Sequence, residues 1–244
     1  MMDRLLARRH TILLVVIVTT FLVRPLFGEG PVALMVFSVA LLALLLLALY
    51  TTQVDDLVGD RDVLVHQRRR RWLIAWPLGL VAIAERLYSL VNPSARLLTV
   101  AMLCWLAFFA FVTWSLLRTL LKHREVTGET IAMAVSIYLL IGLTWGMLYI
   151  ALFQQHPDAF SFGGSTVPTP ALTPERQSIF PVFIYFSLTT LSTIGFGDIL
   201  PLSLEARYAA VAEGITGQFY LAILVARLVG LQMSGTAGRN DRAP

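Results

Sequence analysis

The chain has 244 residues, of which 57% are hydrophobic and 14% are charged, and its mean hydropathy is +0.74. A soluble protein of this length carries about a quarter charged residues and cannot bury this much apolar sequence in one core. The composition therefore excludes an ordinary water-soluble domain and predicts a membrane protein. The net charge of +4 comes from short basic clusters beside apolar segments. Such clusters are typical of membrane topology signals, so we expect no nucleic acid partner.

Six apolar segments are long enough to cross the bilayer, because about 20 apolar residues span the hydrocarbon core as a helix. They cover residues 11–27, 31–50, 72–91, 97–121, 130–153 and 204–233. A seventh apolar segment, 179–192, is too short to span, and its composition predicts a re-entrant helix. The predicted fold is thus an all-α membrane protein with six transmembrane helices. The re-entrant helix and an irregular loop lie between the fifth and sixth of them.

Basic residues predict the orientation of these helices. Most of the 19 Lys and Arg fall in segments that share one side of the membrane when the N-terminus is cytoplasmic. The sequence therefore predicts a multi-pass protein of the cell membrane with both termini in the cytoplasm. The connection between the second and third helices holds a run of arginines that favours a solvated loop or a contact with anionic lipid headgroups. This run is Arg68, Arg69, Arg70 and Arg71.

The segment 189–201, which reads TTLSTIGFGDILP, follows the short helix. Irregular backbone at membrane depth is tolerated only where protein buries it or where it lines a water-filled path. Gly195 and Gly197 permit the alternating backbone angles that turn successive carbonyls to one side. A ring of such carbonyls replaces the water shell of a cation, and Thr193 adds a hydroxyl. We expect Ile194 and Phe196 to point away from the path and to brace the strand against the short helix.

The letters TLSTIGFGD closely resemble the selectivity-filter signature of potassium channels. The resemblance implies that backbone carbonyls, together with the Thr193 hydroxyl, coordinate potassium. The implied filter residues are Thr193, Ile194, Gly195, Phe196 and Gly197, with Asp198 at the outer mouth. One filter per chain implies a homotetramer, since the family surrounds its ion with four. No cofactor is implied beyond potassium as the permeant ion.

The filter also departs from the common pattern of the family. Phe196 replaces the commoner tyrosine and lacks the hydroxyl that bonds into the pore helix. Tyr185 and Phe186 stand where many relatives carry tryptophans. Thr189 stands where some bacterial relatives place a glutamate that pairs with the aspartate corresponding to Asp198. These differences predict a filter held in place by other contacts.

Small and polar residues mark the two long helices around the filter. Gly142 and Gly146 form a G-x-x-x-G pattern that predicts close contact between the fifth and sixth helices. Gly217 is spaced from the filter like the hinge glycine of two-helix bacterial potassium channels; close packing of small residues explains it equally well. Glu213 and Gln218 are candidates to face a water-filled cavity. For Glu213, pairing with a neighbouring helix is the alternative.

The resemblance divides the chain into a four-helix transmembrane domain at 1–125, a pore domain at 126–238 and a short cytoplasmic tail at 239–244. The first domain resembles a voltage-sensor layout. Its fourth helix, however, carries Arg96 and Arg118 only at its ends. Since each elementary charge crossing the field contributes only about 2.3 kcal/mol per 100 mV, we expect weak or no voltage gating.

The sequence therefore predicts a passive potassium-selective ion channel and not an enzyme, because it carries no P-loop, metal-ligand cluster or nucleophile elbow. Three alternatives remain open. These alternatives are a weakly selective cation channel, a subunit of a potassium uptake transporter, and a non-conducting partner subunit.

Overall fold

The computed structural model describes residues 8–27, 39–40, 43–44, 46–48, 50, 95–123, 126–163 and 179–240. The fold is mostly helical. Its helices are α2 (Arg9–Phe27), α5 (Ala95–Lys122), α6 (Gly128–Gln155), α7 (Ile179–Leu191) and α8 (Leu204–Asn240), and its short elements are η1 (Pro157–Ala159), β1 (Phe160–Phe162) and β2 (Ile199–Pro201). The predicted third span, the four-arginine run and residues 164–178 of the predicted outer loop lie outside the described residues.

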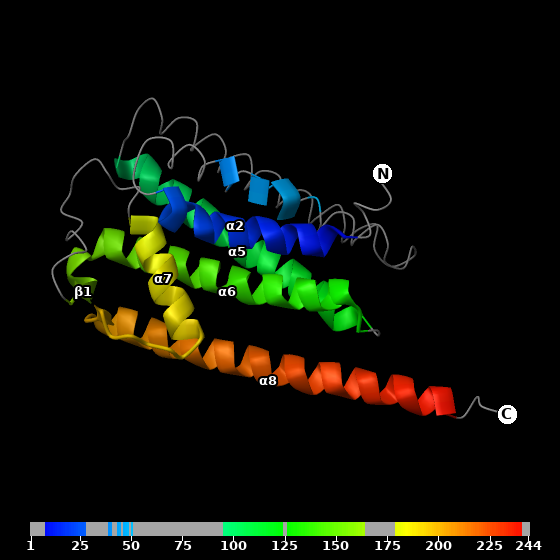
Figure 1. The fold of residues 1–244 in the computed structure, drawn as a ribbon. Helices are drawn as coiled ribbons and strands as arrows, with labels where there is room; N and C mark the ends of the chain where they lie inside the picture. The colour runs from blue at the N-terminus through cyan, green and yellow to red at the C-terminus, as the bar shows by residue number, and fades with distance from the viewer. Residues whose placement is uncertain are drawn as a thin grey trace, which may run out of the picture.

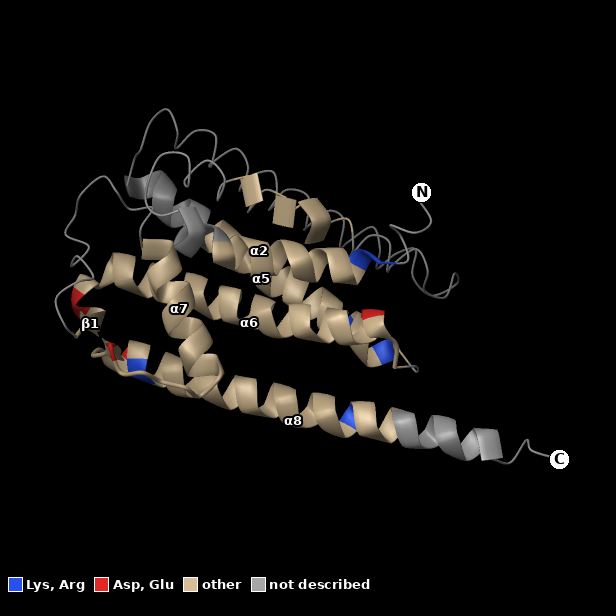
Figure 2. Ribbon diagram, in the orientation of Figure 1, with Lys and Arg blue, Asp and Glu red and all other residues tan. Residues whose placement is uncertain are grey.

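Helix α6 is the centre of the assembly, in contact with α2, α5, α7 and α8. In Figure 1, α2 and α5 lie on one side of α6 and α8 lies on the other, whereas the short α7 crosses α6 at a steep angle and ends beside α8. Helices α2 and α6 run in one direction, and α5 and α8 run in the opposite one. Charged residues gather near the two ends of the bundle, with long uncharged stretches between them (Figure 2). This distribution suits a bundle whose middle lies in hydrocarbon.

Three helices are long and apolar enough to cross a membrane: Leu103–Lys122, Gly128–Gln155 and Leu204–Leu231. They correspond to the predicted fourth, fifth and sixth spans. The apolar part of α2, Arg9–Leu22, is shorter than a full span. The chain is therefore a mostly helical membrane protein, and the count of six spans stays a prediction.

One carboxylate fastens the beginning of α2 to the beginning of α6. That carboxylate is Glu129, in the first turn of α6, which accepts hydrogen bonds from the backbone amides of His10 and Thr11 and from the Thr11 hydroxyl. The turn itself is capped by Thr127, which exchanges hydrogen bonds with Thr130 and so satisfies amides that the first helical turn leaves free. The beginning of α2 thus obtains its acceptors from another helix, which fixes the two parallel helices at one level.

A two-stranded sheet follows the end of α6 and was not predicted from the sequence; the rest of the described chain is mostly helical, as predicted. Strand β1 pairs antiparallel with β2, and Ser161 lies opposite Leu200. Two flanking bonds extend the pairing, since Gly163 N donates to the Asp198 carbonyl at 2.8 Å and Leu202 N donates to the Ala159 carbonyl at 2.7 Å. Each strand has three residues, which is too short for an alternating pattern to stand out in the sequence.

The predicted partner of Gly142 and Gly146 was wrong. These glycines face α7 and not α8. A Cβ atom on Gly142 would lie 2.7 Å from the flexible end of Leu188. On Gly146 it would overlap the end of the Ile184 side chain and lie 3.3 Å from both the Ile184 Cα and the Phe183 carbonyl oxygen. The absence of side chains on this face of α6 lets the short helix approach its backbone.

We expect Gly146→Ala to destabilise the protein more than Gly142→Ala. The added methyl at 146 meets backbone atoms of α7, which move only with the helix, whereas at 142 it meets a side chain that can rotate. Overpacking of this kind costs about 1–3 kcal/mol. Thermal unfolding in detergent measures the difference, with Gly142→Ala as the matched control. Equal midpoints for the two variants would contradict this account of the contact.

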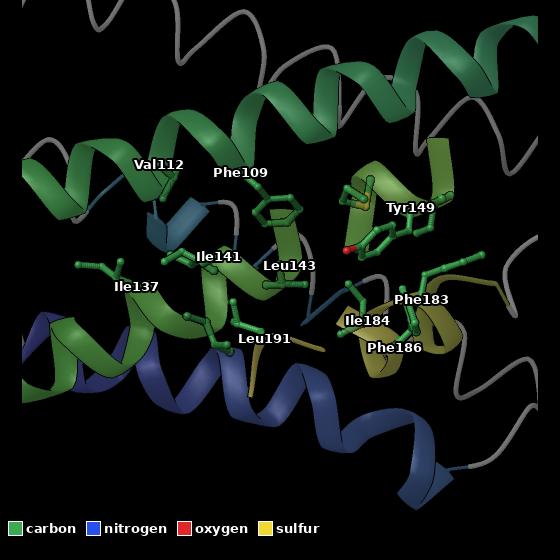
Figure 3. Packing of buried hydrophobic residues seen from close by; sticks show 14 of the residues in the cluster. Phe109, Val112, Ile137, Ile141, Leu143, Tyr149, Phe183, Ile184, Phe186 and Leu191 are labelled. Carbon is green, nitrogen blue, oxygen red and sulfur yellow. The ribbon is translucent and has the colours of Figure 1, made fainter. Parts of the chain in front are cut away.

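An aromatic cluster near the end of α6 joins α6, α7 and β1. Tyr149 meets Phe186 edge to face at a centroid distance of 4.9 Å, and Phe160 meets Phe183 at 4.9 Å. Figure 3 shows Tyr149 of α6 directed toward the labelled side chains of α7. Edge-to-face pairs at these distances stabilise beyond their burial alone. The cluster therefore fixes the position of the helix that leads into the 193–198 segment.

Candidate ion-conducting site

The segment after α7 has an unusual backbone. Thr193, Gly195 and Gly197 adopt φ angles of 61°, 53° and 77°, respectively. The left-handed region is thus occupied at every second residue. Glycine adopts this region without steric cost, whereas threonine does not. The sequence predicted the alternation from the two glycines, and Thr193 extends it by one position.

The amides of this segment are turned toward the end of α7. Thr193 N donates to the Thr190 carbonyl at 3.0 Å. Ile194 N and Gly195 N both donate to the Thr189 carbonyl, at 2.9 Å and 3.1 Å. Within the described part of the chain, no hydrogen bond ends on the carbonyls of 193–197. Residues 193–198 are exposed on the single chain, so these carbonyls are free to contact something outside it.

Tyr185 supplies two contacts that the sequence analysis missed. Its ring stacks on that of Phe196, with a centroid distance of 6.2 Å and an interplanar angle of 2°. Its hydroxyl donates to Asp198 Oδ2 at 2.9 Å. Burial and this hydrogen bond raise the pKa of the Tyr185 phenol, so it remains a donor. One side chain of α7 thus contacts the segment at both Phe196 and Asp198.

Of the other contacts considered for the segment, the one between Phe196 and α7 is present, whereas Thr189 and Asp198 bond to other groups. Phe196 rests on α7 as predicted but is 68% exposed, and Ile194 is 57% exposed. The Thr189 hydroxyl donates to the Phe186 carbonyl at 2.9 Å. Asp198 Oδ1 instead accepts a hydrogen bond from the Ile199 amide at 3.1 Å.

Glu213 and Gln218, the two cavity candidates, lie in different surroundings. Glu213 is fully buried, and its carboxyl contacts the hydroxyls of Tyr149 on α6 and Ser187 on α7. Of the two environments predicted for Glu213, a water-filled cavity or a neighbouring helix, the structure shows the contact with neighbouring helices. Gln218 is exposed on the single chain. Ser187, the only serine or threonine in the first nine positions of α7, was the available signal for this contact.

Gly217 lies against the last residue of α7. A Cβ atom there would overlap the Leu191 carbonyl oxygen and lie 3.0 Å from Leu191 Cδ1. The same carbonyl accepts a hydrogen bond from the Tyr138 hydroxyl at 3.2 Å. Close packing thus accounts for this glycine, and its role as a hinge stays a prediction.

Comparison with known proteins places these features in a family. Residues 137–232 match the protein family described as "Ion channel". The potassium channel protein kcv of Paramecium bursaria Chlorella virus 1 is 30% identical over 77 residues, which cover 77% of that protein and 32% of this chain. The chain belongs to the potassium channel family.

Two longer members of the potassium channel family match as well. The voltage-gated potassium channel Kch of Escherichia coli (strain K12) is 26% identical over 170 residues, which are 67% of this chain and 37% of Kch. The two-pore potassium channel 4 of Arabidopsis thaliana is 31% identical over 105 residues, which are 43% of this chain and 32% of that protein. The matches therefore span only about a third of these two relatives.

The region matched to the ion channel family includes α7 and the segment after it. It also contains most of α8, which exposes a long apolar stripe. Members of the stripe recur every three or four residues, so they share one face of the helix. They are Leu204, Tyr208, Val211, Ile215, Phe219 and Ile223, each at least half exposed.

Proposed function

We propose that the chain is a passive potassium-selective channel whose ions pass along the backbone carbonyls of 193–197. The observation that carries this proposal is the alternation of left-handed φ angles at Thr193, Gly195 and Gly197. With the amides of Thr193, Ile194 and Gly195 bonded to α7, the carbonyls of the segment are left to coordinate a dehydrated cation, as carbonyl rings do in potassium filters. Asp198, at the outer end of the segment, adds negative charge near the mouth.

We infer that four copies surround the ion. An apolar stripe on α8 does not by itself require other copies, because lipid covers apolar side chains equally well. Free backbone carbonyls are different, since lipid offers them no donor and they must face water, ions or protein. One chain supplies one side of such a path. A homotetramer in the cell membrane supplies all four sides and covers the α8 stripe.

The gating proposal is that voltage has little effect on opening. Helix α5 carries no charged residue between Arg96 and Arg118. The Arg118 guanidinium lies over the Trp114 ring at 4.8 Å from its centroid, near the end of the helix. A helix without charge in its middle moves little charge through the field. Cytoplasmic placement of both termini remains part of the proposal.

A weakly selective cation channel is the second candidate, and one observation favours it. Phe196 has no hydroxyl, and the segment is held at this position by ring stacking on Tyr185. Stacking is less directional than a hydrogen bond. A filter held in this way discriminates less strictly between ions if its carbonyls adapt to sodium.

Recording currents from the full chain in planar bilayers, with potassium on one side and sodium on the other, tests the proposal. We expect a reversal potential displaced far from zero, in the direction that opposes potassium flow, and little change in open probability across a voltage series. A reversal potential near zero would favour the weakly selective channel. Absence of current, compared with bilayers without protein, would contradict both. Native mass spectrometry of the same sample tests for four copies.

A further inference from the structure

Glu213 is a buried acid that the conduction path does not use. It lies in the first third of α8, and none of its side chain is exposed. Tyr149 O–H donates to Glu213 Oε2 at 2.5 Å, and Ser187 Oγ lies within hydrogen-bond distance of Oε1. The acid therefore joins three helices, one of which leads directly into the filter segment.

Ser187 makes two close oxygen contacts but has only one hydroxyl proton, so the second contact needs a proton from another group. Ser187 Oγ lies 2.7 Å from the Gly142 carbonyl oxygen as well as close to Glu213 Oε1. A hydroxyl has one proton, and a carbonyl oxygen has none. If Ser187 donates to Gly142, the contact between Ser187 and Glu213 needs a proton on the carboxyl. If Ser187 donates to a carboxylate instead, two bare oxygens face each other at 2.7 Å.

The surroundings of Glu213 offer no compensating charge. The ionisable side chains of α6 are Glu129, Tyr138 and Tyr149, and α7 carries only Tyr185, whose hydroxyl bonds to Asp198. Among the residues that the structure describes, no lysine, arginine or histidine pairs with Glu213. An unpaired carboxylate in an apolar interior is costly, whereas a hydrogen-bonded neutral acid is much less so.

We propose that Glu213 is held as a neutral carboxylic acid, whose proton completes a chain of hydrogen bonds from Tyr149 through Glu213 and Ser187 to the Gly142 carbonyl. This chain fastens α7 to both α6 and α8. Glu213 is thus a positioning residue for the filter and does not attract ions. The part concerning the filter rests on the proposed function, whereas the protonation of the acid does not.

Infrared spectroscopy of the full chain in lipid bilayers tests the protonation without any current. We expect a carbonyl band of a protonated carboxylic acid at neutral pH that disappears in Glu213→Gln. Glu129→Gln is the matched control and should keep the band, since the hydrogen bonds that Glu129 accepts within the described residues come from the beginning of α2. A wild-type spectrum without the band would overturn the inference, whatever the channel conducts.

Currents test the positioning role. Glutamine accepts from Tyr149 and donates to Ser187, so Glu213→Gln should conduct within roughly twofold of wild type at neutral pH. Ser187→Ala interrupts the chain and should lower the selective current roughly tenfold. Raising the pH should reduce the wild-type current and leave that of Glu213→Gln flat. A folded tetramer of Glu213→Gln that no longer conducts, beside an active Glu213→Asp, would overturn the proposal, because it would show that the negative charge is required.

Discussion

Replacing Gly195 by alanine is expected to abolish potassium conduction while leaving the helices intact. Gly195 has a φ of 53°, where an L-residue costs about 1–2 kcal/mol, or about 4–8 kcal/mol summed over the proposed tetramer. Relief of this strain rotates the peptide between Ile194 and Gly195. The Gly195 amide then leaves the Thr189 carbonyl, now 3.1 Å away, and the Ile194 carbonyl turns from the path.

Potassium efflux from vesicles holding a fixed amount of protein measures the loss, which should reach at least roughly tenfold, the effect of about 1.4 kcal/mol. Gly230→Ala is the matched control. This glycine lies within α8 with nothing within 4 Å of an added Cβ and with no left-handed backbone, so alanine suits the helix better. Circular dichroism and the elution volume should match for both variants. Unchanged efflux from Gly195→Ala would contradict the role assigned to the alternating backbone.

The local features of the pore could be predicted because each depends on a few neighbouring residues. The short α7 was predicted from the length of its apolar run, and the left-handed backbone after it from Gly195 and Gly197. Span positions for α5, α6 and α8 follow from length and hydropathy in the same way. Such properties do not require knowledge of which helix packs against which.

The features that were missed or misassigned depend on partners distant in the sequence. The pattern of Gly142 and Gly146 indicated a close helix contact, but the pattern cannot name its partner, which is α7 and not α8. Glu213 presented two equally reasonable environments until Tyr149 and Ser187 were found beside it. Sequence position alone does not reveal a contact between residues 64 positions apart.

The contact of Tyr185 with Phe196 and Asp198 was missed for a related reason. The sequence shows which common partners are absent, and the family pattern predicts that position 189, a threonine here, faces Asp198. Which side chain replaces a missing partner depends on the rotation of α7 about its axis. That rotation is set by the aromatic cluster and by the glycine face of α6, neither of which lies in the filter signature.

Gly217→Ala should destabilise the pore, because its methyl has no room beside Leu191. The added Cβ would overlap the Leu191 carbonyl oxygen and lie 3.2 Å from the carbonyl carbon. Leu191 is fully buried, and Tyr138 holds the same carbonyl from α6. The end of α7 cannot yield without disturbing the residues that follow it. We expect a loss of about 1–3 kcal/mol in the free energy of unfolding, measured by thermal unfolding in detergent.

The matched control, Gly214→Ala, separates packing from hinge motion. An added Cβ at 214 would lie 3.9 Å from the Thr190 carbonyl oxygen, an ordinary contact, so its unfolding midpoint should stay near that of wild type. A hinge at Gly217 predicts altered open probability with an unchanged midpoint, because alanine stiffens the helix without straining it. Close packing predicts a lower midpoint together with reduced conduction, since the displaced carbonyl of Leu191 lies two residues before the first left-handed position at Thr193.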